Sequence, residues 1–263
     1  KMSKELLISA IKVSVEAGKK ILEIYDTAFS VELKDDESPL TAADKASHEI
    51  ISSELLKWGF PILSEEGKAI SYDDRKKWEN YWLVDPLDGT KEFIKRNGEF
   101  TVNIAFMIGN SPLLGIIYSP VLGTVCAGFN NVVYSLSKAD VDGLSVESLH
   151  QYELHPAENS SSDEIKVVAS RSHLSVETEK YISMLNLNGA KISMVNAGSA
   201  LKFCLLAEGK ATVYPRFAPT MEWDTAAGHA ILKACGKNIM LYPSNTEMKY
   251  NKPSLVNDWF IAR

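Results

Sequence analysis

The chain has 263 residues, a length that fits one large domain or two closely joined parts. Hydrophobic residues make up 45% and charged residues 24% of it, which excludes a largely disordered chain because a sizeable core is available. The 34 acidic residues outnumber the 28 basic residues and give a net charge of −6, which argues against a general nucleic-acid binder.

The first 60 residues predict two helices. Apolar residues recur at helical spacing over residues 3–26, with Ser3 as the expected N-cap. After a polar loop at residues 35–39, a second helix is predicted from Thr41 to about residue 58. Asp44 follows Thr41 by three residues, as in a capping box.

The middle of the chain predicts strands. Residues 61–64 and 81–84 are short apolar runs, and an acidic residue follows each of them directly. Residues 100–134 contain apolar runs separated by Gly, Asn, Ser and Pro, which is typical of an antiparallel meander. The polar and weakly patterned residues 136–163 are expected to form a mobile loop or a boundary.

The second half alternates between strand and helix patterns, which favours α/β layering. The predicted strands are 165–169, 191–195 and 211–214, and the predicted helices are 176–185, 199–208 and 223–234.

Signals of disulfides, zinc and export are absent from the sequence. Cys126, Cys204 and Cys235 contain no CxxC pair, so we expect free thiols in a reducing cytosol and no disulfide partner. The N-terminal residues lack the apolar stretch of a signal peptide, and no apolar run reaches the roughly 18–20 residues that span a bilayer. We therefore expect a cytoplasmic protein.

Two carboxylates follow the apolar strand at residues 82–84. Pro86 and Leu87 make a tight turn between Asp85 and Asp88, and a turn brings such side chains toward one point. The two carboxylates would repel each other unless a cation lay between them. Oxygen ligands of this kind suit Mg²⁺ or Mn²⁺ rather than zinc.

Gly89 and Thr90 follow at once, and a glycine turn directs backbone N–H groups at an anion. Other acidic residues have simpler explanations when each is taken alone. Asp44 and Asp224 fit helix caps, and Glu65 with its neighbour Glu66 fits a solvated turn. The spacing alone does not show that these residues converge.

Together these segments resemble the inositol monophosphatase superfamily of lithium-sensitive phosphatases. Its metal-binding motif is similar to Asp85-Pro86-Leu87-Asp88-Gly89-Thr90, and its other elements are similar, in the right order, to residues 41–44, 63–66 and 223–228. Four further segments resemble the bacterial 3′(2′),5′-bisphosphate nucleotidases within this superfamily, namely residues 81–102, 170–173, 199–204 and 214–217.

The resemblance implies an α/β fold with α-β-α-β-α layers in one compact unit. Residues 1–135 would carry the main metal motifs, and residues 136–263 the nucleotide-binding segments and the last metal ligand. It also implies hydrolysis of 3′-phosphoadenosine 5′-phosphate to AMP and phosphate in sulfur metabolism, with two or three Mg²⁺ ions per site.

The resemblance also implies roles for individual residues. The implied metal ligands are Glu65, Asp85, the Leu87 carbonyl, Asp88 and Asp224. Asp44 and Thr90 would position and deprotonate the attacking water, and Glu65 would support that step by holding the cation. The backbone amides of Gly89 and Thr90 would bind the phosphate.

For the nucleotide, we expect Ser199, Lys202 and Arg216 at the 5′-phosphate and sugar, with His173 near the adenine. The alternatives are solvated surface positions for Lys202 and Arg216, and a capping or core position for His173. Three further expectations concern other residues: Glu222 adds an unexplained charge beside the second motif, His229 is structural, and Trp82, Trp223 and Trp259 belong to the core.

Two other functions compete with this one. An inositol or sugar phosphatase would use the same metals, and a nucleotide sensor would bind without turnover. The sequence leaves open whether the protein is a monomer or a homodimer, and whether it touches the inner membrane face.

Overall fold

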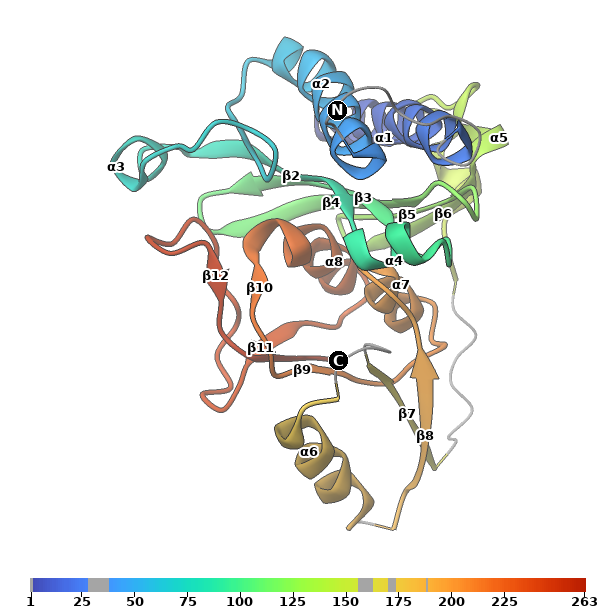
Figure 1. The fold of residues 1–263 in the computed structure, drawn as a ribbon, viewed down its shortest axis with the longest axis vertical. Helices are drawn as coiled ribbons and strands as arrows, with labels where there is room; N and C mark the ends of the chain where they lie inside the picture. The colour runs from blue at the N-terminus through green and yellow to red at the C-terminus, as the bar shows by residue number, and fades with distance from the viewer. Residues whose placement is uncertain (1, 28–37, 156–162, 170–173, 188) are drawn as a thin grey trace.

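The computed structural model describes residues 2–27, 38–155, 163–169, 174–187 and 189–263. Helices and sheets alternate along its long axis (Figure 1). Helices α1 and α2 cover one face of a six-stranded sheet, and α7 and α8 cover the other. Smaller sheets and α6 lie beyond α7 and α8. The layered α/β arrangement expected from the sequence is confirmed.

The first layer consists of α1 (Met2–Thr27) and α2 (Pro39–Leu55), which continues as a 3-10 turn at Leu56–Trp58. Both predicted caps are wrong. Helix α1 already includes Ser3, and the N-cap of α2 is Ser38, whose Oγ accepts from the Thr41 backbone N–H at 3.2 Å. Pro39 occupies the first helical position, where its missing N–H costs nothing. Asp44 is therefore free of a capping role. The predicted loop residues 35–37 lie outside the described residues.

The six-stranded sheet has its strands in chain order, with β1 parallel to β2 and antiparallel pairing from β2 onward. Successive residues of β2 face opposite cores: Trp82 packs under α1 and α2, and Leu83 packs under α7 and α8. Burial on both faces explains why these strands read as continuous apolar runs. The strands are β1 (Ile62–Ser64), β2 (Asn80–Asp88), β3 (Thr101–Ile108), β4 (Ser111–Ser119), β5 (Thr124–Phe129) and β6 (Val132–Ser137). The predicted meander is confirmed. Two short helices flank β2, α3 (Tyr72–Arg75) and α4 (Thr90–Lys95).

The segment after β6 is more ordered than the sequence suggests. It forms α5 (Lys138–Val141) and a 3-10 turn at Leu149–Tyr152. Val141, Leu144 and Leu149 are buried against the first core. Up to residue 155 the segment is therefore not an unstructured loop, because these spaced apolar side chains anchor it, and the expected boundary in this region stays a prediction. Residues 156–162 lie outside the described part.

The second half follows the predicted alternation, with additional strands near the C-terminus. Strand β7 is parallel to β8, and the sheet β11-β13-β9 contains two strands that the sequence did not suggest. The division of the chain at residue 135 stays a prediction. The elements are β7 (Glu164–Ala169), α6 (Val176–Asn186), β8 (Lys191–Asn196), α7 (Leu201–Ala207), β9 (Tyr214–Arg216), β10 (Thr220–Met221), α8 (Glu222–Ala234), β11 (Ile239–Leu241), β12 (Val256–Asn257) and β13 (Phe260–Ala262).

The structure also describes the cysteines and the length and polarity of the helices. All three cysteines are free, with Cys126 and Cys204 buried and Cys235 half-buried. Among the described helices, none has the length and apolar character needed to cross a bilayer.

Helix α8 approaches the sheet closely because glycines face it. A Cβ at Gly115 of β4 would lie 2.8 Å from the Ala227 Cα, and a Cβ at Gly128 of β5 would lie 2.6 Å from the Ile231 Cα. Both neighbours are backbone atoms, which do not yield as a flexible side chain would. The missing side chains therefore set the distance between α8 and the sheet.

We predict that Gly115→Ala lowers the free energy of unfolding by about 1–3 kcal/mol, because the added methyl group overpacks a rigid contact. Urea denaturation measures this change. Gly143→Ala is the matched control, since a Cβ at Gly143 meets no atom within 4 Å. Equal stability of the two variants would contradict the close-packing argument.

Candidate active site

The site begins at a bulge in β2. Asp85 pairs with Asn103 and Asp88 pairs with Thr101, so three steps along β2 match two steps along β3. In a regular strand, residues three apart point to opposite faces, and one extra residue reverses that relation. The bulge lies at Pro86 and Leu87, and it turns both carboxylates toward the same side.

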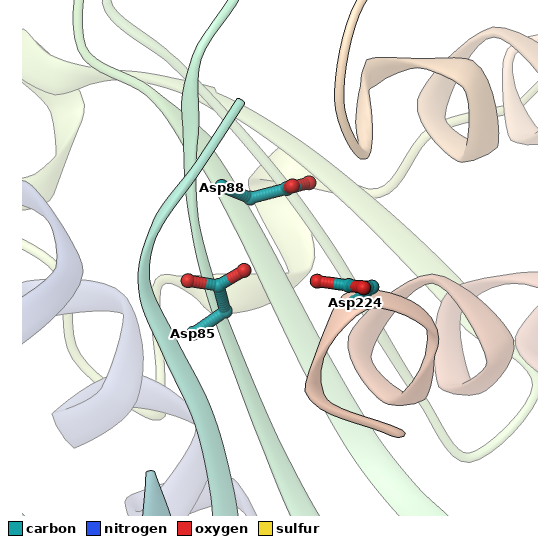
Figure 2. Close-up of side chains that lie close together, drawn as sticks. All are labelled: Asp85, Asp88 and Asp224. Carbon is teal, nitrogen blue, oxygen red and sulfur yellow. The ribbon is translucent and has the colours of Figure 1, made fainter. Parts of the chain in front are cut away.

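Asp224 brings a third carboxylate from the start of α8. Its Oδ2 accepts a 2.7 Å hydrogen bond from the Met221 backbone N–H, so Asp224 does serve the N-terminus of its helix. One oxygen from each of Asp85, Asp88 and Asp224 lies within 4.8 Å of the others. Figure 2 shows the three side chains directed toward a common space. The structure thus brings together two motifs that lie far apart in the sequence.

Glu65 and Asp44 lie at the edge of this cluster. Glu65 follows β1 directly; its residue surface is exposed, but its carboxyl group interacts electrostatically with that of buried Asp85. Asp44 lies in α2 and is only 8% exposed. Three residues further along α2, the Ser47 Oγ donates to the Pro86 carbonyl at 2.7 Å, which fixes the helix against the bulge.

Two polar residues of β3 are hydrogen-bonded to the cluster. The Asn103 Nδ2 donates to the Asp88 Oδ2 at 3.2 Å, and the Thr101 Oγ1 donates to the Asn103 Oδ1 at 2.9 Å. Sequence reasoning missed Thr101 and Asn103. Their signal is the presence of buried polar side chains in an otherwise apolar strand.

Burial and mutual repulsion raise the pKa values of these carboxyl groups. Burial, followed by the charge of Asp224, raises the pKa of Asp88 to about 7. Burial, followed by the charges of Glu66 and Glu65, raises the pKa of Asp44 to about 7. The pKa values of Glu65, Asp85 and Asp224 are also raised, chiefly by burial.

The donor set fits a divalent cation. It consists of carboxylate oxygens, with no thiol or imidazole among the three clustered residues. Hard cations such as Mg²⁺ prefer oxygen donors. A cation there would relieve the repulsion that the raised pKa values reflect.

A cavity of about 240 Å³ opens beside Asp88 and Asp224. Gly89 and Thr90 line it on the acidic side, and Lys202 and Arg216 add positive charge. Lys202 is 5% exposed; its Nζ donates to the Ser199 carbonyl at 3.0 Å and lies 5.4 Å from the centre of the Tyr214 ring. Burial lowers the pKa of Lys202 to about 8.

The alternative of solvated surface positions is therefore wrong for Lys202, which is buried, and does not describe Arg216, which is half-buried. Ser199 also lines the cavity, but its hydroxyl donates to the Glu99 carbonyl. Its backbone is left-handed, with φ +44°. Ser199 thus ties the cavity wall to the end of the loop before β3, and its hydroxyl proton is already used.

Two other expected relations, those of Thr90 and His173, have different outcomes. Thr90 and Asp44 share no hydrogen bond in the part of the chain that the structure describes. His173, with the rest of residues 170–173, lies outside the described residues, so its expected place near the adenine stays a prediction.

The expectations for His229 and the three tryptophans have different outcomes. His229 is fully buried, and its ring nitrogens contact the Tyr250 hydroxyl at 3.0 Å and the Asn238 Oδ1 at 2.7 Å, as a structural histidine should. Trp82 is fully buried, and Trp223 packs partly buried against the second core. Trp259 is 36% exposed, so its expected core position is wrong; its ring lies 5.6 Å from that of Phe217.

Comparisons with known proteins agree with this geometry. The inositol monophosphatase family matches residues 2–258. The 3′(2′),5′-bisphosphate nucleotidase CysQ of Escherichia coli O157:H7 is 42% identical over 89% of this chain and 89% of its own length. The CysQ of Salmonella typhimurium is 40% identical over 97% and 98%. The crystal structure of CysQ from Bacteroides thetaiotaomicron, a bacterial member of the family, superposes with a TM-score of 0.86, at 44% identity over 98% of this chain and 96% of that chain.

We predict that stabilisation by Mg²⁺ grows with pH. In the metal-free folded protein, Asp44 and Asp88 have a pKa of about 7, whereas the pKa of an aspartate in the unfolded chain is about 4. These carboxyl groups therefore bind protons at pH values at which the unfolded chain has already lost them. The folded state then binds more protons than the unfolded state between these values, so metal-free stability falls as pH rises through about 7.

Thermal unfolding with Mg²⁺ and with EDTA measures the effect. We expect the difference in Tm to increase by about 5 °C or more between about pH 5.5 and about pH 8. In Asp88→Asn the increase should shrink, because one titrating carboxyl is gone. A difference in Tm that falls with pH would contradict the prediction.

Proposed function

Because this chain belongs to the inositol monophosphatase family and is a phosphatase of that metal-dependent family, we propose that its substrate is 3′-phosphoadenosine 5′-phosphate. Hydrolysis of the 3′-phosphate gives AMP and inorganic phosphate. The observation that carries the proposal is the cavity itself, which joins an acidic cluster to the cationic side chains of Lys202 and Arg216, with Lys91 and Glu92 also in its wall. The names of the 40–42% identical relatives, which match nearly end to end, support the same substrate.

We assign the metal to Mg²⁺, with two or three ions per site. Glu65, Asp85, the Leu87 carbonyl, Asp88 and Asp224 would hold them. The bulge leaves Leu87 outside the regular pairing with β3, which supports a free carbonyl at this position. When bound, Mg²⁺ lowers the pKa of a water ligand and stabilises negative charge on the leaving oxygen.

The protein groups around this site have separate tasks. The Thr90 hydroxyl orients the attacking water, and the Asp44 carboxylate takes up its proton. Burial is the main cause that raises the pKa of Asp44, and it acts whether or not a cation is bound, which favours a general base at this position. Backbone N–H groups of Gly89 and Thr90 donate to the phosphate. Gly89 is left-handed, with φ +91°, a conformation that glycine adopts without strain and that lets the backbone approach the ligand.

Lys202 and Arg216 bind the 5′-phosphate. The Arg216 Nε is buried and has no hydrogen-bond partner among the described residues, which supports an anionic ligand here. Ser199 fixes the wall between this end and the metal, and His173 contacts the adenine. We also propose that the enzyme acts in sulfur metabolism in the cytoplasm.

The first test compares substrates. Phosphate release should be faster on 3′-phosphoadenosine 5′-phosphate than on inositol 1-phosphate, since only the nucleotide offers a second phosphate to the two cationic side chains. EDTA should abolish release on both compounds. A preference for inositol 1-phosphate would favour an inositol or sugar phosphatase, and nucleotide binding without release would favour a sensor.

The second test concerns the cationic end of the cavity. Lys202→Met should raise KM for the nucleotide by about tenfold, because one charge-assisted hydrogen bond to phosphate contributes about 1.5–3 kcal/mol. The rate on inositol 1-phosphate should change little. Lys210→Met is the control, since Lys210 is exposed and pairs with Glu208 at 2.7 Å. Equal losses on both substrates would remove Lys202 from nucleotide recognition.

A further inference from the structure

A buried charge stands two residues before Asp224. Glu222 begins α8, and its side chain is fully buried. One oxygen, Oε1, accepts from the Asn251 backbone N–H at 2.6 Å; the other, Oε2, accepts from the Lys252 backbone N–H at 3.2 Å and from the Lys252 Nζ at 2.5 Å. Both oxygens are thus committed to two neighbouring residues near the C-terminus.

A second buried charge binds the same segment. Arg75, at the end of α3, is 3% exposed. Its Nη1 donates to the Asn251 Oδ1 at 2.9 Å and to the Lys252 carbonyl at 2.6 Å, and its Nη2 donates to the Pro253 carbonyl at 2.9 Å. The Asn251 Nδ2 returns a bond to the Arg75 carbonyl at 2.7 Å. Residues 251–253 are therefore bound by both Glu222 and Arg75, and we call them the strap.

The strap connects two parts of the acidic site. Arg75 belongs to the connection between β1 and β2, which begins with Glu65. Glu222 precedes Asp224, and the pairing of β10 with β12 continues the attachment along the next residues. Helix α3 and strand β12 lie on the same side of the molecule, at the left of Figure 1.

The attachment reaches the Asp224 carboxylate through one backbone group. Met221 pairs with Val256 of β12, and the Asn257 Nδ2 donates to the Met221 carbonyl at 2.9 Å. The Met221 N–H in turn donates to the Asp224 Oδ2 at 2.7 Å. A shift of the strap would therefore move the donor that orients Asp224.

We propose that Glu222, Arg75 and Lys252 form a clamp on the strap that positions Asp224 for the metal. The Glu222–Lys252 ion pair joins a fully buried carboxylate to a half-buried ammonium group. Ion pairs with buried charges contribute little net stability compared with apolar residues, and their best-attested use is in fixing one arrangement. Groups that orient a metal ligand change metal affinity by about 10–100-fold when they are removed. The three residues are positioning residues, and the inference rests on the metal site of the proposed function.

The test measures Mg²⁺ binding by calorimetry, without substrate. Lys252→Met should weaken Mg²⁺ binding by about tenfold, because Glu222 loses its charged partner and the strap loosens. Lys249→Met is the matched control; Lys249 lies three residues earlier, is exposed, and its Nζ is 3.9 Å from Glu247. Lys252→Arg keeps the charge and should retain most of the affinity.

A separate variant covers the case in which Lys252→Met is too unstable to purify. Glu222→Gln keeps the size of the side chain and removes its charge, and it should weaken Mg²⁺ binding in the same direction. At saturating Mg²⁺, kcat of both variants should return to within about threefold of the parent, since no group that touches substrate is changed.

Each outcome decides a different question. A lowered Tm with unchanged Mg²⁺ affinity in both Lys252→Met and Glu222→Gln would overturn the clamp and leave a purely structural contact. Absence of Mg²⁺ binding in the unmodified protein would overturn the metal site itself. Activity on another phosphate ester would change the proposed substrate and leave the clamp intact.

Discussion

Three carboxylates with oxygens within 4.8 Å of one another are the constraint on which this structure depends. Burial and mutual repulsion oppose their ionisation, as the raised pKa values of Asp85, Asp88 and Asp224 indicate. Rigid elements hold them against that repulsion: a strand bulge for two and a helix N-terminus for the third. The glycine contacts that bring α8 onto the sheet serve the same end, because they set how near Asp224 comes to β2.

The sequence predicts the elements whose signals are local. Apolar runs bounded by turn residues give the meander, and helical spacing gives α1, α2 and α8 to within a few residues. The caps of the first two helices were not predictable in the same way, since Ser38 and Thr41 are both good caps and only the position of Pro39 separates them. Strands β11 and β13 have three residues each and depend on pairing with distant segments, which no local pattern records.

The same distinction between local signals and tertiary contacts applies to the site. The type and order of the acidic residues indicate metal chemistry, whereas their convergence depends on the bulge at Pro86 and on the packing of α8. Ser199 shows what a motif leaves open: its place in the cavity wall agrees with the expectation, but its hydroxyl faces the Glu99 carbonyl. Asn103 of β3 donates a hydrogen bond to Asp88 of the neighbouring strand β2. Only the register of the two strands reveals such a partner.

The net charge of −6 is hard to reconcile with an anionic substrate until the charges are placed. The proposed ligands include four carboxylates, those of Glu65, Asp85, Asp88 and Asp224, and two divalent cations carry an equal and opposite charge. Bound metal would therefore neutralise the acidic end of the cavity. Among the other charged side chains that line the cavity, Lys91, Lys202 and Arg216 would then outnumber Glu92, so the remaining charge would be positive. By binding the proposed cations, the same carboxylates that make the chain acidic would allow a polyanion to enter.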